Sequence, residues 1–175
     1  MRIKKNIEIE KTYLIKYIPK NLFKCQFKEI EDLYIPKGAS HARLRIRRSG
    51  DLFVVTKKIP VKDRNASFHS EFNLEITKQE FNALRSSKCD IVRKTRFYYP
   101  YLGMMAEIDV FKGKHKGLVL VDFEFSNKNK LDKFKIPDFC LVDVSEEEFV
   151  AGGVLCKHSF SSLKPHLKKF NYKKI

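Results

Sequence analysis

The stretch IEIEKTYLIK, residues 7–16, has a two-residue period that predicts a β-strand. One face carries apolar side chains such as Ile7 and Ile9, and the opposite face carries Glu8 and Glu10. A surface strand with solvated glutamates would account for this stretch taken alone. Ionisable residues recur two apart on many later segments, however, and a closed barrel with a charged interior accounts for all of them together.

Seven further segments have a strand pattern and are joined mostly by short turns, such as the hairpin signal Ser49-Gly50. Helices are expected at 77–86, where Thr77 and Glu80 form a capping box, at 145–151, opened by Ser145 and Glu148, and at 161–170. Only the first of these interrupts the strands, which favours antiparallel pairing. The other expected strands are residues 26–35, 41–48, 51–58, 68–76, 91–99, 104–111 and 118–125.

These features predict a mainly β fold with flanking helices, in the α+β class. About eight strands close into a barrel with room for a small ligand, so we expect an eight-stranded antiparallel tunnel with a charged interior. The helices would cover the apolar outside of the strands. We expect residues 1–175 to form a single domain.

Composition excludes several classes of protein. The 175 residues are 43% hydrophobic and 33% charged, as in a globular chain, and no apolar run approaches the roughly 20 residues of a membrane span. The N-terminus lacks the apolar core of a signal peptide. The four cysteines have no zinc-binding spacing, which favours free thiols in a reducing cytoplasm. We therefore expect a cytoplasmic protein without a membrane partner.

The net charge of +15 indicates either a polyanionic partner or a basic, soluble surface. Many lysines lie in the C-terminal KPHLKKFNYKKI, which looks solvated, whereas the arginines cluster inside predicted strands. An RNA-binding function would rest on net charge alone, because the chain has no aromatic stacking motif of the RNP type, so a nucleic-acid partner is not expected. A monomer and a homodimer both remain open.

The charged strand faces suggest a ligand. Burying them without partners would be costly, and a ligand with phosphates and a divalent cation would lower that cost. Arginine binds phosphate oxygens in a bidentate manner, and Mg²⁺ or Mn²⁺ prefers carboxylate oxygens. The expected inward acids are Glu8, Glu10, Glu71, Glu75, Glu107, Asp109, Asp122 and Glu124, and the expected inward bases are Arg43, Arg45, Arg47, Lys57, Lys94 and Arg96.

The same segments carry a family resemblance. They are IEIEKTYL at 7–14, ARLRIR at 42–47, VTK at 55–57, EFNLEI at 71–76, RKTRFYY at 93–99, AEIDVF at 106–111 and GLVLVDFEF at 117–125. In this order they resemble the CYTH superfamily, the triphosphate tunnel metalloenzymes. The resemblance implies an eight-stranded antiparallel tunnel that binds a small triphosphate compound and Mg²⁺ or Mn²⁺. Known activities in the family include inorganic triphosphatase, thiamine-triphosphatase, RNA triphosphatase and class IV adenylyl cyclase.

The resemblance also implies roles for individual residues. Glu8, Glu10, Asp109, Asp122 and Glu124 would face the metal, and Arg43, Arg45, Lys57, Lys94 and Arg96 would bind the phosphates. The catalytic set would be Glu8, Glu10, Lys57 and Arg96. The acidic tunnel residues Glu71, Glu75 and Glu107 either bind metal or orient the basic side chains. Lys58 replaces Lys57 on the inner face if the strand carries a bulge.

One position departs from the family pattern. The family begins with ExExK, but here Glu10 is followed after one residue by Thr12, and Lys11 points to the outer face. Either Lys16 or Arg47 replaces the missing cation, or the substrate is handled differently, or activity is reduced. We expect metal-dependent hydrolysis of an inorganic or organic triphosphate. The alternatives are a class IV-type adenylyl cyclase and a non-catalytic polyphosphate- or nucleotide-binding protein.

Overall fold

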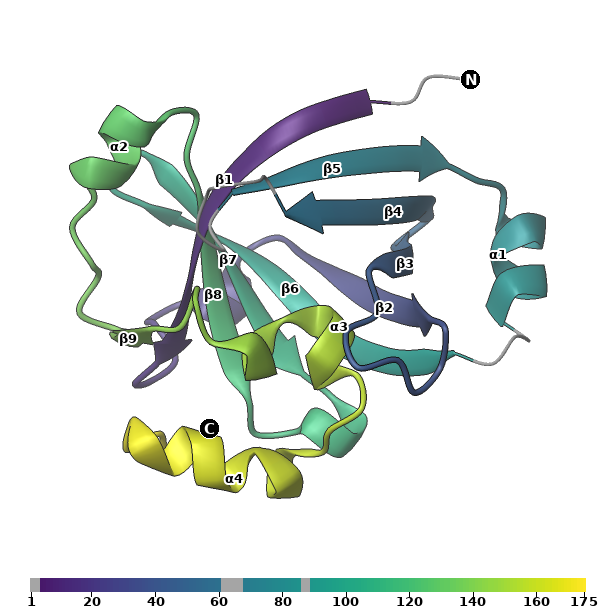
Figure 1. Ribbon diagram of the computed structural model, residues 1–175. Helices are drawn as coiled ribbons and strands as arrows, with labels where there is room; N and C mark the ends of the chain where they lie inside the picture. Colours follow the sequence, from purple (N-terminus) through teal and green to yellow (C-terminus); the bar gives the residue numbers. More distant parts are fainter. Residues whose placement is uncertain (1–3, 61–67, 86–88) are drawn as a thin grey trace.

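Nine β-strands form one antiparallel sheet (Figure 1). The computed structural model describes residues 4–60, 68–85 and 89–175, without the side chains of residues 4–8, 60, 68 and 69. The strands are β1 (Lys4–Ile15), β2 (Phe27–Ile35), β3 (Leu44–Ser49), β4 (Leu52–Pro60), β5 (Phe68–Glu75), β6 (Asp90–Tyr101), β7 (Met104–Phe111), β8 (Val119–Glu124) and β9 (Cys140–Asp143).

Short helices lie around the sheet and at one end of it (Figure 1). Among the described residues, no helix has the length and apolar character needed to cross a membrane. The α-helices are α1 (Lys78–Arg85), α2 (Lys128–Asp132), α3 (Gly152–Leu155) and α4 (Phe160–Lys169), and the 3₁₀ helices are η1 (Leu22–Lys24), η2 (Gly113–His115) and η3 (Glu148–Val150).

The strand order is β5-β4-β3-β2-β6-β7-β8-β1-β9, with an additional pairing between β1 and β5. The long strand β1 changes partners along its length: residues 4–9 pair with β5, residues 10–14 with β8 and residues 13–15 with β9. A mainly β, antiparallel architecture is therefore confirmed. The expectation of an eight-stranded closed barrel is wrong: the sheet has nine strands and is not closed into a barrel. The ninth strand, β9, was missed because it joins β1 by a long-range pairing and has no strong local pattern.

Two elements and one helix boundary differ from the sequence prediction. Helix α2 and strand β9 are additional elements, in a part of the chain where the sequence analysis names no helix or strand. The predicted capping box at Ser145 does not form, because the Ser145 hydroxyl donates to Asp143 Oδ1 and accepts from the backbone N–H of Thr12. As a result η3 starts only at Glu148, and α3 begins at Gly152, where the predicted helix was to end.

Helix α1 and its capping box agree with the prediction. The Thr77 hydroxyl accepts from the Glu80 backbone N–H, and Glu80 Oε2 accepts from the Thr77 backbone N–H in return. Phe81 of this helix packs with Leu33 and Ile46, which lie on the apolar outer face of the strands. Helix α1 thus covers the outer face of the strands, as expected. The opposite, charged face of β3 and β4 points to the interior.

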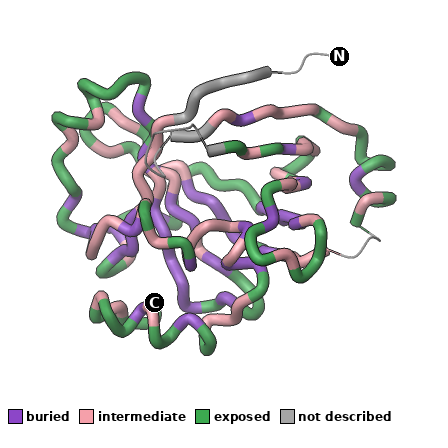
Figure 2. Tube along the Cα trace, in the orientation of Figure 1, coloured by how far each residue is buried: buried purple, intermediate pink, exposed green. Residues whose placement is uncertain are grey.

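Helix α4 belongs to a second packing unit at one end of the sheet. Its Leu163 and Leu167 are buried with Phe111 and Leu120 from β7 and β8. Figure 2 shows buried residues concentrated along the central strands, and exposed residues on α2 and on the outer side of α4. The apolar end of the sheet is therefore covered by the C-terminal segment.

Candidate active site

A cavity of about 670 Å³ lies against the charged faces of the strands. This volume is in the range of small-ligand sites. The cavity collects side chains from β1 to β8 and from the segment before α3. The predicted site residues that line it are Glu10, Arg43, Arg45, Glu71, Lys94, Arg96, Glu107, Asp109, Asp122 and Glu124.

Three predicted residues are not placed in this lining. Lys57 is exposed and points away, because Thr56 pairs directly with Arg45 and so shares its face, which puts Lys58 rather than Lys57 inside. No bulge is needed; the inner positions of β4 are the even-numbered ones. Glu75 is exposed at the end of β5 and also lies outside the lining. The side chain of Glu8 lies outside the described residues.

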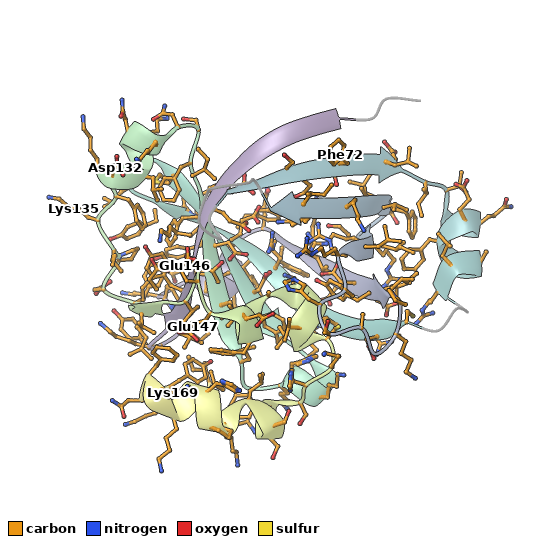
Figure 3. All side chains as sticks on the ribbon, viewed as in Figure 1. Phe72, Asp132, Lys135, Glu146, Glu147 and Lys169 are labelled. Atoms are coloured by element: carbon orange, nitrogen blue, oxygen red, sulfur yellow. The ribbon has the colours of Figure 1, made fainter. Side chains whose placement is uncertain are left out.

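Several lining residues escaped the sequence analysis. The inner face of β2 includes Asp32 and Tyr34, and the segment that leads into η3 contributes Glu146 and Glu147, which Figure 3 labels. The β2 residues could have been found, since Ile30, Asp32 and Tyr34 alternate with outward residues in the same way as the arginines of β3. The Glu146 and Glu147 positions depend on the fold of a loop and had no sequence signal.

The acidic side of the cavity lies on β1 and β8. Glu10 is directly opposite Glu124 in the antiparallel pair, and Thr12 is opposite Asp122. Burial, followed by the charge of Glu10, raises the pKa of Asp122 to about 6, although Arg96 opposes the shift. Burial together with the charges of Glu107 and Glu10 also raises the pKa of Glu124. These carboxylates are therefore close enough to disfavour one another's charged forms, which a cation would reverse.

A second group of charges, around Arg96, is neutralised internally. The guanidinium donates from Nε to Asp109 Oδ1 at 2.7 Å, from Nη2 to Asp109 Oδ2 at 2.6 Å and from Nη2 to Asp122 Oδ2 at 3.1 Å, and it also pairs with Glu107. Lys94 makes a short ion pair with Asp109. Burial would raise the pKa of Asp109, but the charges of Arg96 and Lys94 outweigh it and lower this pKa to about 2.

This geometry bears on three predicted roles. Asp109 is almost fully buried between two cations, so it is a counter-ion for Arg96 and Lys94 in this structure rather than a carboxylate turned toward a metal. Arg96 has most of its five N–H donors on carboxylates. Asp122 shares one oxygen with Arg96 and the other with the Thr12 hydroxyl.

The basic side of the cavity lies on β3 and β4, where Arg45 makes longer contacts than Arg96 does. Arg45 Nη2 is 3.6 Å from Glu71 Oε1 and 3.4 Å from the Thr56 hydroxyl, both long contacts. Arg45 Nε is buried and has no hydrogen-bond partner among the residues that the structure describes. Lys58 Nζ lies 3.4 Å from Glu10 Oε1 and 3.3 Å from Glu71 Oε2 and so reaches from β4 toward β1. A buried donor without a partner is costly, and an anionic ligand would satisfy it.

Arg47 differs from Arg45 because its charge is already matched. Its Nε and Nη2 donate to the two carboxylate oxygens of Asp32 at 2.6 and 2.8 Å. The charges of Arg47, acting against burial, hold the pKa of Asp32 well below its usual range. This bidentate pair occupies the guanidinium, so Arg47 is not the replacement for the cation missing at Thr12; Lys58 is the ammonium that contacts Glu10.

The carboxylates on β1 and β8 are oxygen ligands of the kind that hard divalent cations prefer. In the part of the chain that is described, no three His, Cys, Asp or Glu side chains are gathered closely enough to hold a metal ion. The nearest arrangement is Glu10 facing Glu124, next to Asp122, on adjacent strands. The donor chemistry of Glu10, Asp122 and Glu124 therefore suits a divalent cation.

Comparisons with known proteins agree with this architecture. The chain is 25% identical over 155 residues to the inorganic triphosphatase of Acetivibrio thermocellus, which covers 78% of this chain and 98% of that protein. The crystal structure of the inorganic triphosphatase NE1496 matches with a TM-score of 0.62 and 24% identity, over 85% of this chain and 93% of that one. A putative adenylate cyclase from Bacillus halodurans matches with a TM-score of 0.52 and 19% identity, over 98% and 93% of the two chains.

No protein-family model matches the chain. The solved structures, at 24% and 19% identity, are informative about the fold. The strand order and these structural matches together show that the chain shares its fold with the inorganic triphosphatase NE1496 and with the putative adenylate cyclase from Bacillus halodurans.

Proposed function

We propose that this protein is a triphosphatase that hydrolyses a small inorganic or organic triphosphate, with a divalent cation such as Mg²⁺ or Mn²⁺. The observation that carries this proposal is the division of one cavity into two sides. Glu10, Asp122 and Glu124 lie together on β1 and β8, while Arg45 and Lys58 reach in from β3 and β4. The distant similarity to an inorganic triphosphatase supports the same chemistry.

The basic side would bind the phosphates. The Arg45 guanidinium has a buried Nε donor to offer, and its contact with Glu71 is long enough to be exchanged for a phosphate oxygen. Lys58 would add a point charge close to the same anion. Arg43 lines the rim of the cavity and is exposed, so it would meet the substrate on entry. These residues bind and orient the triphosphate.

The acidic side would hold the cation. We assign Glu10, Asp122 and Glu124 to this role, together with Glu8, and we leave out Asp109 because two cations already neutralise it. A bound Mg²⁺ or Mn²⁺ would neutralise phosphate charge and supply a polarised water. Arg96 would orient Asp122 and Glu107, with which it forms ion pairs, in addition to any contact with phosphate.

The proposal also covers how far the cavity surrounds the ligand and which residues form the domain. Side chains from eight strands line one cavity, which supports a site that contacts the ligand from several sides. An enclosed site would exclude bulk water and strengthen these charge interactions. We propose that residues 1–175 act as a single domain of this kind.

The experiment is an assay of phosphate release from tripolyphosphate with Mg²⁺ or Mn²⁺, with ATP and thiamine triphosphate as alternative substrates. Glu10→Gln should abolish turnover, and Arg45→Ala should raise KM by about tenfold or more with little change in Tm, since Arg45 has only long contacts within the protein. Glu75→Gln and Arg48→Ala, at exposed positions, are the matched controls.

The outcomes separate the competing functions. Cyclic AMP formation from ATP would favour the cyclase, and tight binding without turnover would favour a non-catalytic triphosphate binder. If Arg45→Ala unfolds while its activity per folded molecule is unchanged, the phosphate-binding role of Arg45 is wrong.

A further inference from the structure

Two segments on the surface near the C-terminus carry lysines and no acid. Residues 110–121 and 149–175 contain no Asp or Glu. Their exposed lysines lie at residues 112–116, at 157 and at 164–174. We call the exposed lysines of these two segments the lysine surface. The cavity does not use them, since none of them is among its lining residues.

The two segments are physically adjacent. The backbone N–H of Ile175 donates to Gly117 O at 3.2 Å, and the Tyr172 hydroxyl donates to the same oxygen at 3.0 Å. The aliphatic part of Lys174 packs directly on the α-carbon of Gly117. Lys114 Nζ donates to the backbone oxygen of Cys156, just before Lys157. The lysine surface is therefore one continuous feature formed by η2, α4 and the tail (Figure 1).

Helix α4 presents its lysines outward because its other face is anchored. Leu163 and Leu167 are buried, so Lys164 and Lys168, one turn apart, lie on the exposed side (Figure 3 labels their neighbour Lys169). Lys112 is the exception on the lysine surface, since it pairs with Glu29 at 2.7 Å. So many like charges held together by a fixed fold repel one another, and a polyanion relieves that repulsion.

The chemistry of the lysine surface favours a bare phosphate chain. The two segments contain no arginine, so the lysine surface offers ammonium point charges rather than the guanidinium groups that bind base edges in a bidentate manner. The aromatic side chains of the same segments already have partners: Lys174 Nζ lies over the Phe160 ring, 5.7 Å from its centroid, Phe170 stacks with Phe149, and the Tyr172 hydroxyl donates to the backbone oxygen of Gly117. No exposed ring is available for a base to stack on among these residues, and stacking is the usual basis of single-stranded nucleic-acid binding.

We propose that the lysine surface is a docking site for linear inorganic polyphosphate, separate from the cavity. Such a chain has a charged phosphate at every unit and no bases. It therefore matches a surface of closely spaced lysines that has no exposed aromatic ring and no arginine. Binding would release counter-ions and would be strongly dependent on salt. The proposal does not require that the cavity hydrolyse triphosphate.

The test measures binding of fluorescently labelled long-chain polyphosphate by anisotropy at several salt concentrations. The variant combines Lys116→Glu, Lys169→Glu and Lys173→Glu, and the matched control combines Lys128→Glu, Lys130→Glu and Lys133→Glu at and next to α2, with the same change in net charge. We expect the first variant to bind at least about tenfold more weakly with a shallower salt dependence, and the control to change by less than about threefold.

Three results would overturn the proposal: no binding by the wild type, equal losses in the two triple variants, or equally tight binding of single-stranded RNA with the same number of phosphates. The last result would make the lysine surface a nucleic-acid site. A set of Lys→Gln changes at the same positions preserves the comparison if a Glu variant does not fold.

Two further measurements distinguish binding at the lysine surface from binding in the cavity. Arg45→Ala should keep polyphosphate binding, and the lysine triple variant should keep tripolyphosphate turnover. A protein that binds polyphosphate in this pattern but never releases phosphate would refute the proposed triphosphatase and leave the docking site standing.

Discussion

The Thr12 hydroxyl donates a hydrogen bond of 2.7 Å to Asp122 Oδ1, across the antiparallel pair of β1 and β8. The sequence pattern that this chain resembles has a lysine at the position of Thr12. A neutral hydroxyl orients the Asp122 carboxylate but adds no charge, so the acidic side of this cavity carries one positive charge fewer than a lysine would give it. Among the described residues, Lys58 on β4 brings its ammonium group to 3.4 Å from Glu10 Oε1.

Thr12→Lys should therefore restore a cation beside the phosphates. We expect the KM for tripolyphosphate to fall about fivefold, which corresponds to about 1 kcal/mol for one added, partly screened charge contact. Steady-state kinetics with Mg²⁺ measures this change. Thr12→Val is the control, because it removes the hydrogen bond without adding charge and should not lower KM. An unchanged KM in a folded Thr12→Lys protein would show that the position does not face the phosphates.

Lys57 and Lys58 are adjacent lysines on opposite faces of β4. Lys58→Met should weaken tripolyphosphate binding by about tenfold, since its ammonium reaches the cavity, whereas Lys57→Met should leave binding unchanged. Calorimetric titration of both variants compares them directly. The opposite ranking would mean that the register of β4 differs from that described here.

Asp109 is the common counter-ion of Arg96 and Lys94. Asp109→Asn leaves two buried cations with too little negative charge, and we expect the free energy of unfolding to fall by about 3 kcal/mol. Urea denaturation measures the loss. The control is Glu29→Gln, which breaks the exposed pair with Lys112 and should cost less than about 1 kcal/mol. Similar losses in both variants would argue against a buried network.

Asp122 gives a prediction about pH. Its pKa is raised to about 6 in the folded protein, above the value of roughly 3.9 for an unfolded chain. Between these two values the folded state binds more protons, so stability decreases as pH rises through this window. Relative to Asp122→Asn, the wild type should lose about 2 to 3 kcal/mol of unfolding free energy between pH 4 and pH 7.

Denaturant curves for both proteins across that range test the sign. A difference that is constant with pH, or one that grows in favour of the wild type on raising pH, would show that the Asp122 carboxyl is not destabilised in its charged form.

The local alternation of residues was enough to predict much of the site. Arg45, Glu107 and Asp122 all line the cavity, as their two-residue spacing within strands predicts. The capping box at Thr77 was likewise readable, because capping depends on residues three positions apart. These features need only the geometry of one strand or one helix end.

The tertiary structure decided what each charge contacts. Sequence spacing could not show that Asp109 faces Arg96 and Lys94, that Arg47 is taken by Asp32, or that Lys58 reaches Glu10, because these pairs join different strands. The inner face of β4 also depended on its register with β3, and a shift of one residue reverses every side chain. The sequence by itself thus determined a mainly β, antiparallel chain with alternating charged faces. Long-range pairing alone decided which charges neutralise one another and which remain available to a ligand.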